Sequence, residues 1–227
     1  MNYYYNQVPG QEPWRNNLIY TSLMSADKKT FVQWYHNDTD YHKGMNEVID
    51  PALMDEKWLR EVNYLTQMRN AYPDLVPTIT NIDIANKKIH LQVEGPDLWQ
   101  RSLDLSCSFN EILPDWQEQM LAIIQAHKNL GIYKYSLHPN SYFIVNGKLK
   151  SINYFFCYRD SDGPITVNSF ISHISHNRRI ELKKHSEAMG IDWDTPTSLQ
   201  QIQQLAFESF SKDYPDNFMA RAKLIYE

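Results

Sequence analysis

HKNLGIYKYSLHPNSYFIVNGKLKSINYFF, residues 127–156, is the stretch that decides the fold. Its first part predicts a helix that ends at Gly131, because glycine readily takes the left-handed conformation that closes a helix. A short apolar strand at 132–133 and a polar loop follow it. Two strand-like runs then flank Asn146 and Gly147, a pair that favours a two-residue hairpin turn because both residues tolerate a positive φ.

This order resembles the catalytic loop of the protein-kinase superfamily, especially the small kinase-like group that includes the aminoglycoside and lipopolysaccharide-core kinases. In that group the loop reads His-Gly-Asp-Leu-His-Pro-x-Asn, followed by an apolar pair, a turn and Ile-Asp-Phe. The residues that match are Leu137, His138 and Pro139 in the loop and His127, Gly131 and Ile132 at the helix end before it. The resemblance implies that Gly131, Leu137, His138 and Pro139 frame the loop in a kinase-like path.

The residues that carry chemistry in that family are replaced in this chain. Lys134 stands where the family has the loop histidine, and Ser136 where it has the catalytic aspartate. Ser141 replaces the metal-binding asparagine, and Asn153 replaces the metal-binding aspartate of the Asp-Phe-Gly segment. A serine holds no negative charge near neutral pH, and an asparagine offers only a neutral carbonyl. The resemblance therefore implies a loop without the base and metal ligands of phosphoryl transfer.

Residues 1–94 resemble the small lobe of that family, an antiparallel sheet with one helix. Segments 18–24 and 30–36 are rich in β-branched and aromatic residues and predict a hairpin. In the family the second strand of this hairpin carries a phosphate-binding lysine, and the equivalent triplet, residues 32–34, places Trp34 there. The chain also has no glycine between residues 11 and 43, so the glycine-rich phosphate loop is missing as a motif.

A helix is predicted over 51–71, because Asp50 is a good cap and Pro51 suits the first helical position. Apolar residues that recur every three positions predict its buried stripe: Leu59, Val62, Leu65 and Met68. Glu61 stands where the family has the glutamate that holds the strand lysine. With a tryptophan in place of that lysine, a solvated helix charge is the favoured interpretation of Glu61.

Strands predicted over 76–84 and 88–93 lead into residues 94–98, EGPDL, which resemble the hinge between the two kinase lobes. In kinases the hinge backbone bonds the adenine, whatever the side chains are. The resemblance implies a nucleotide or hinge pocket at Val32, Gln92, Val93, Glu94 and Gly95. No cofactor is expected, although ATP binding stays open, and Mg²⁺ is not expected.

Residues 95–227 are expected to form a reduced, mostly helical second lobe that contains the degenerate catalytic loop at 132–155. Residues 101–110 are interpreted as a polar connection. Helices are predicted from residue 114 onward and over 167–176, 178–189, 199–210 and 218–225, with a capping box at Ser198 and Gln201. The expected fold class is α+β, a two-lobed protein-kinase-like fold.

Composition limits the function classes. A formal net charge of −5 gives no positive field for nucleic acid or an anionic membrane. No run approaches the roughly 18 apolar residues of a membrane span, so neither partner is expected. Cys107 and Cys157 lack metal or redox spacing, which favours free thiols and a cytoplasmic location. The high aromatic content favours contacts with another protein.

Three functions follow from these observations. The first is a pseudokinase, a catalytically inactive kinase-like protein that binds another protein as a scaffold or modulator. The second is a nucleotide-binding domain without turnover. The third is an unorthodox phosphotransferase, for which the nearest spare carboxylates are Asp97, Asp104, Asp160 and Asp162. Ser136 as a nucleophile is disfavoured because no adjacent base is evident.

A group of basic residues and a group of histidines are two further candidate sites. A basic face, Arg178, Arg179, Lys183 and Lys184, is interpreted as a solvated helix face that could contact an acidic partner or phosphate. His173, His176 and His185 are spaced for neighbouring helical turns, but a helix boundary expected at Asn177 separates them. No metal site is therefore predicted.

Overall fold

The computed structural model describes residues 20–36, 51–168 and 176–227. The protein is α+β, with a small antiparallel sheet and a mainly helical remainder. The chain divides into two compact units: residues 1–97 with 142–155, and residues 98–141 with 156–227. The boundary predicted at 94/95 lies close to the first division. Residues 142–155, which the sequence assigned to the second part, group with the first unit instead.

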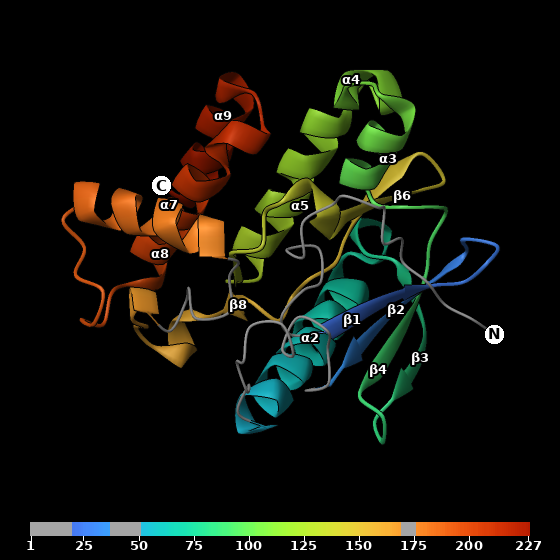
Figure 1. Ribbon diagram of the computed structural model, residues 1–227, viewed down its shortest axis with the longest axis horizontal. Helices are drawn as coiled ribbons and strands as arrows, with labels where there is room; N and C mark the ends of the chain where they lie inside the picture. The colour runs from blue at the N-terminus through green and yellow to red at the C-terminus, as the bar shows by residue number, and fades with distance from the viewer. Residues whose placement is uncertain (1–19, 37–50, 169–175) are drawn as a thin grey trace. The chain divides into compact units, whose positions relative to one another are not determined.

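The first unit contains a four-stranded antiparallel sheet of order β1-β2-β4-β3 (Figure 1). Its strands are Tyr20–Met24, Thr30–Tyr35, Thr78–Asp83 and Lys88–Gln92 for β1 to β4. The helix α2, Pro51–Ala71, lies between β2 and β3 in the sequence and has the predicted bounds. A short 3-10 turn, Pro73–Leu75, follows it.

The buried face of α2 differs from the predicted stripe. Leu65 and Met68 are buried as expected, but Leu59 is 57% exposed. The residues that face the interior are Met54, Lys57, Trp58, Glu61, Tyr64, Leu65 and Met68, each of which lies three or four positions from others of the set. A helix turns once every 3.6 residues, so a strict three-residue repeat drifts off one face. Glu61 thus lies in the middle of the buried face.

A second hairpin also belongs to the first unit. Strands β6, Tyr142–Val145, and β7, Lys148–Ser151, pair antiparallel around the predicted turn. Asn146 and Gly147 have φ values of 52° and 68°, which is the left-handed geometry that this two-residue turn needs. The backbone N–H of Asn146 donates to Oε2 of Glu94 at 2.9 Å, so the turn is tied to the end of β4.

The second unit is mainly helical. Its helices are α3 Leu98–Leu105, α4 Phe109–Ile112, α5 Trp116–Asn129, α7 His176–Ala188, α8 Leu199–Phe210 and α9 Asp216–Tyr226. Short strands β5, Tyr133–Lys134, and β8, Cys157–Tyr158, pair with each other. Three short 3-10 turns, Pro139–Ser141, Asp160–Asp162 and Ser211–Asp213, complete it. The predicted cap is present, since Oγ of Ser198 accepts the N–H of Gln201 at 3.2 Å.

One expectation for the second unit is wrong. Residues 101–110 are not a polar connection, because α3 and α4 occupy most of this segment. Ser108 and Glu111 form a capping box at the start of α4, a local signal that predicts a helix there. The helix boundary expected at Asn177 lies one residue from the start of α7 at His176.

The observed buried face of α2 predicts that alanine substitutions at two of its leucines lower the free energy of unfolding by different amounts. Leu65→Ala should lower the free energy of unfolding by about 2–5 kcal/mol, because it removes fully buried methyl groups. Leu59→Ala, the matched control, should change it by about 0.5 kcal/mol or less, because Leu59 is mostly exposed. Urea unfolding followed by circular dichroism measures both. Equal costs would contradict the observed face.

Candidate functional site

A buried polar cluster lies inside the first unit, around the side chain of Asn153. Its Oδ1 accepts the hydroxyl of Tyr20 at 2.5 Å and Nε2 of Gln33 at 3.2 Å. These donors come from β1 and β2, and Asn153 follows β7 in the chain. Asn153 has a φ of 66°, a left-handed conformation that asparagine tolerates better than most residues. We call Tyr20, Gln33, Glu61 and Asn153 the Asn153 cluster.

Glu61 contributes a buried carboxylate to this cluster. It is fully buried, and its Oε2 accepts the backbone N–H of Phe155 at 2.9 Å. The hydroxyl of Tyr35 faces the same carboxylate, and burial, followed by the negative charge of Glu61, raises the pKa of Tyr35 well above its usual value. The interpretation of Glu61 as a solvated charge is therefore wrong. The period of the helix, rather than its apolar repeat, decides where Glu61 points.

Gln33, rather than Trp34, reaches the Asn153 cluster. Gln33 is fully buried and lies on the same face of β2 as Phe31 and Tyr35. Trp34 lies on the opposite face, where its ring stacks on His36 at 4.0 Å and Lys88 Nζ lies 4.5 Å from its centroid. The aromatic residues Phe31 and Tyr35, which flank Gln33 at a spacing of two, are the sequence signal that could have placed Gln33 inward.

In the second unit, Lys134 and Ser136 form a hydrogen-bonded pair. Nζ of Lys134 donates to Oγ of Ser136 at 2.6 Å and to the carbonyl oxygen of Ser136 at 3.0 Å. Lys134 is buried, while Ser136 is half-buried. Nε2 of Gln203 in α8 donates to the carbonyl oxygen of Lys134 at 3.1 Å. The serine hydroxyl therefore lies beside a buried amine.

The loop frame is held by buried contacts within the second unit. Gly131 has a φ of 64°, as the predicted helix end requires. Nδ1 of His138 accepts the N–H of Asn140 at 3.1 Å, and the ring of Trp99 lies edge-on to His138 at 5.1 Å. Leu137 and Pro139 are buried, and Ser141 donates its N–H to the carbonyl of His138. The predicted residues thus form an ordered turn.

His127 lies close to Lys134 and is buried in α5. Burial, followed by the positive charge of Lys134, holds the pKa of His127 well below its usual value. The sequence favoured a core histidine at this position over a ligand. A neutral, buried imidazole fits that interpretation.

The backbone N–H groups of the predicted hinge pocket are largely used within the first unit. Val93 donates its N–H to the carbonyl of Lys29 at 2.9 Å, and Gly95 donates to the carbonyl of Lys28 at 2.8 Å. Val32 is also buried, and next to it the ring of Phe31 packs on Phe143 with centroids 4.9 Å apart. The side chains of Gln92 and Glu94 are exposed.

The remaining predicted groups are more dispersed. Arg178, Arg179, Lys183 and Lys184 all belong to α7, but only the two lysine side chains are among those described. Both are exposed, and Lys183 Nζ lies 5.2 Å from the ring centroid of Trp193. His173 lies outside the described residues. Among the residues that the structure describes, no three His, Cys, Asp or Glu side chains are grouped to hold a metal ion.

Comparison with known proteins shows no family for this chain. No protein-family model matches it, and no curated protein sequence matches it. Among the described helices, none is both long and apolar enough to cross a membrane. The function must therefore be argued from the geometry of the two units.

Removal of the central acceptor of the Asn153 cluster should lower the free energy of unfolding. Asn153→Gly keeps the left-handed backbone but leaves two buried donors without their acceptor, so unfolding should become easier by about 1–3 kcal/mol. Asn146→Gly is the control, because Asn146 also has a positive φ but is exposed. It should change stability by about 0.5 kcal/mol or less. Similar losses in both variants, measured by urea unfolding, would contradict this role.

His127 predicts a specific loss of stability in mild acid. Its folded-state pKa is lowered, so the unfolded chain binds the proton first as the pH falls. The contribution of His127 to the free energy of unfolding is fully present above about pH 6.5. Below that pH it falls by about 1.4 kcal/mol per pH unit. His127→Gln should therefore flatten the decline of unfolding free energy between pH 7 and 5. An unchanged slope in this variant would contradict the role of His127.

Proposed function

We propose that this protein is a pseudokinase, a catalytically inactive kinase-like protein that acts by binding another protein. Two features support a kinase-like fold: the loop sequence around Leu137, His138 and Pro139, and a small antiparallel sheet with α2 inserted between β2 and β3. In this proposal the two units correspond to the two lobes.

The single observation that carries the inactive assignment is the neutral hydrogen bond between Gln33 and Asn153. In the kinase-like comparison Asn153 stands at the metal-binding aspartate, and Gln33, next to the predicted lysine position at Trp34, is the β2 side chain that bonds to it. Phosphoryl transfer needs a cation on the phosphates and carboxylates on the metal. Here Oδ1 of Asn153 instead accepts two neutral donors of the chain itself, at 2.5 and 3.2 Å. The oxygen that would face a metal is used for internal stability.

Ser136 supports the same conclusion in the second unit. A general base must accept a proton from the attacking hydroxyl, and this contributes about 10²–10⁴ in rate. The hydroxyl of Ser136 is a weak base, and it accepts a hydrogen bond from Lys134 at 2.6 Å. A donor held on the serine oxygen lowers its basicity further, so Ser136 is a poor substitute for the catalytic aspartate. This also argues against an unorthodox phosphotransferase that uses the same loop.

The alternative of a nucleotide binder without turnover has less support. A purine needs free backbone groups at the hinge, but the N–H groups of Val93 and Gly95 donate to Lys29 and Lys28.

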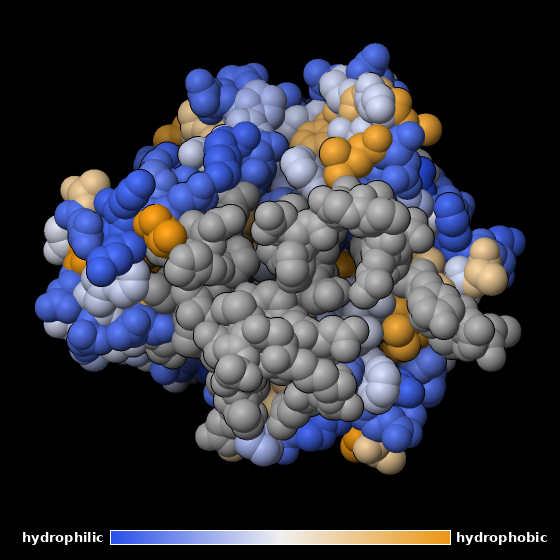
Figure 2. Space-filling model, in the orientation of Figure 1, coloured by the Kyte–Doolittle hydropathy of each residue, from blue (hydrophilic) through white to orange (hydrophobic). Residues whose placement is uncertain are grey.

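Exposed apolar side chains favour a protein partner. Leu103 and Leu105 of α3 are 42% and 65% exposed, and Figure 2 shows hydrophobic side chains gathered over α3 and α4. Apolar patches at the surface of a folded protein often mark interaction sites. This surface, together with the lost chemistry, fits a scaffold or modulator better than an enzyme.

Nucleotide titration tests the proposal. Thermal unfolding should show no shift with millimolar ATP, with or without Mg²⁺ or Mn²⁺, whereas a ligand at about 100 times its Kd would add about 2.7 kcal/mol. The purified protein should also consume no ATP. The control is Ser136→Ala, which should behave as the wild type in both assays. Metal-dependent ATP consumption that disappears in this variant would overturn the assignment as a pseudokinase.

A further inference from the structure

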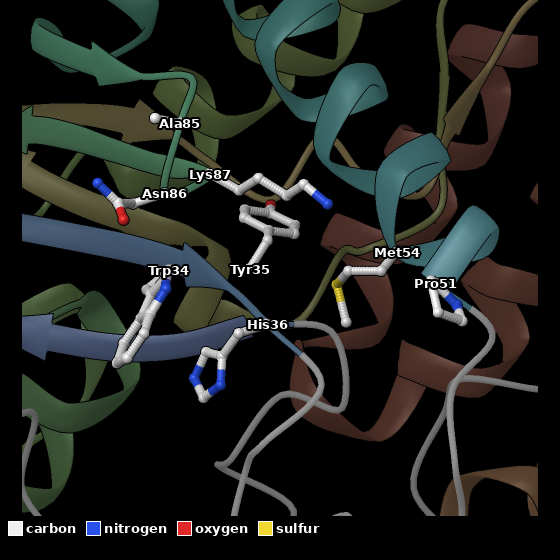
Figure 3. Close-up of a pocket in the computed structure, with 8 residues that line it drawn as sticks. All are labelled: Trp34, Tyr35, His36, Pro51, Met54, Ala85, Asn86 and Lys87. Carbon is white, nitrogen blue, oxygen red and sulfur yellow. The ribbon is translucent and has the colours of Figure 1, made fainter.

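A small pocket lies at one end of the sheet in the first unit. It has a volume of about 260 Å³ and lies between the end of β2, the first turn of α2 and the β3–β4 turn (Figure 3). Trp34 and Asn86 lie at one side of it, and Pro51 and Met54 lie at the other. This volume is slightly below the range of about 300–1,000 Å³ that is usual for sites of drug-sized ligands. It suits one side chain better than a cofactor.

The walls of the pocket favour an aromatic group. Pro51, Met54 and Ala85 supply apolar surface, and the ring of Tyr35 closes the inner side. The polarisable thioether of methionine makes favourable contacts with aromatic rings, often at the ring edge. An aromatic ring therefore gains more from this lining than a branched aliphatic group of similar size.

The charge near the pocket is already paired. Lys87 is the lysine that lines it, and its ammonium forms an ion pair with Asp55 of α2. Figure 3 shows the Lys87 side chain extended over Tyr35 toward α2. A neutral ligand leaves this pair intact.

Trp34 supplies a fixed donor beside the pocket. Its indole N–H donates to none of the residues described by the structure, while its ring is held by His36 at 4.0 Å and by Lys88 at 4.5 Å. A donor whose ring is held in place loses little conformational freedom when it binds an acceptor. A peptide carbonyl next to the bound side chain is the acceptor that suits this position.

We propose that this pocket binds one aromatic side chain from an extended peptide segment of a partner protein. The inference rests on the proposed function and names the surface through which the protein would act. The ring lies against Pro51 and Met54, and the indole N–H of Trp34 binds a backbone carbonyl of the same segment. Peptide recognition commonly combines side-chain pockets with hydrogen bonds to the main chain in this way.

The test uses the full-length chain and N-acetyl-phenylalanine amide as the probe. The indole N–H resonance of Trp34, assigned by its loss in Trp34→Phe, should shift saturably with a Kd of about 1 mM, a value suited to so small a ligand. Ala85→Trp should weaken binding at least about tenfold (1.4 kcal/mol) by filling the mouth of the pocket. Ile84→Trp is the matched control, because Ile84 is 73% exposed on the same turn and does not line the pocket.

Each outcome of this test either supports or overturns the proposed pocket. Wild-type affinity in Ile84→Trp with loss in Ala85→Trp, at equal thermal stability, supports it. The proposal is overturned if no saturable shift occurs, if Ala85→Trp binds as well as the wild type, or if N-acetyl-lysine amide binds equally well. These outcomes concern the pocket alone. The proposed function fails separately, through metal-dependent ATP consumption, whatever the titration shows.

Discussion

One acceptor atom, Oδ1 of Asn153, organises the interior of the first unit. It receives the hydroxyl of Tyr20 and the amide of Gln33, so β1, β2 and the segment after β7 meet at a single oxygen. A buried donor that loses its acceptor costs about 1–3 kcal/mol, and both donors bond to this oxygen. Glu61 adds a second link through the N–H of Phe155, which ties α2 to the same segment.

Under the kinase-like proposal, electrostatics explains why the side chains at positions 33 and 153 are neutral. A lysine and an aspartate at positions 33 and 153 would form a buried ion pair, whose desolvation cancels much of its attraction. Losing only one member would leave an uncompensated buried charge, which typically costs about 3–5 kcal/mol. Glutamine and asparagine remove both charges and keep a hydrogen bond at 3.2 Å. The pair therefore carries neither the desolvation cost of a buried ion pair nor an uncompensated charge.

Local sequence signals predicted the elements well and the site poorly, for a physical reason. The bounds of α2, the turn at Asn146 and Gly147 and the cap at Ser198 depend on residues within a few positions of each other. The bond from Gln33 to Asn153 spans 120 positions, so no local pattern contains it. Glu61 was misplaced because a three-residue apolar repeat concealed the true period of 3.6. The burial of Lys134 beside Ser136 likewise depends on distant helices, including α8 through Gln203.

Two successive residues of β2, Gln33 and Trp34, face the interior and the surface respectively. Strand geometry sends neighbouring side chains to opposite faces, so a residue that serves the core cannot also serve a ligand outside. Gln33 points inward, and its amide donates a hydrogen bond to Asn153. Trp34 points outward, and its indole N–H has no acceptor among the described residues. The N–H groups of Val93 and Gly95 are likewise bonded within the chain. The outer end of β2 differs, because there the indole N–H of Trp34, which has no acceptor among the described residues, lies beside a pocket.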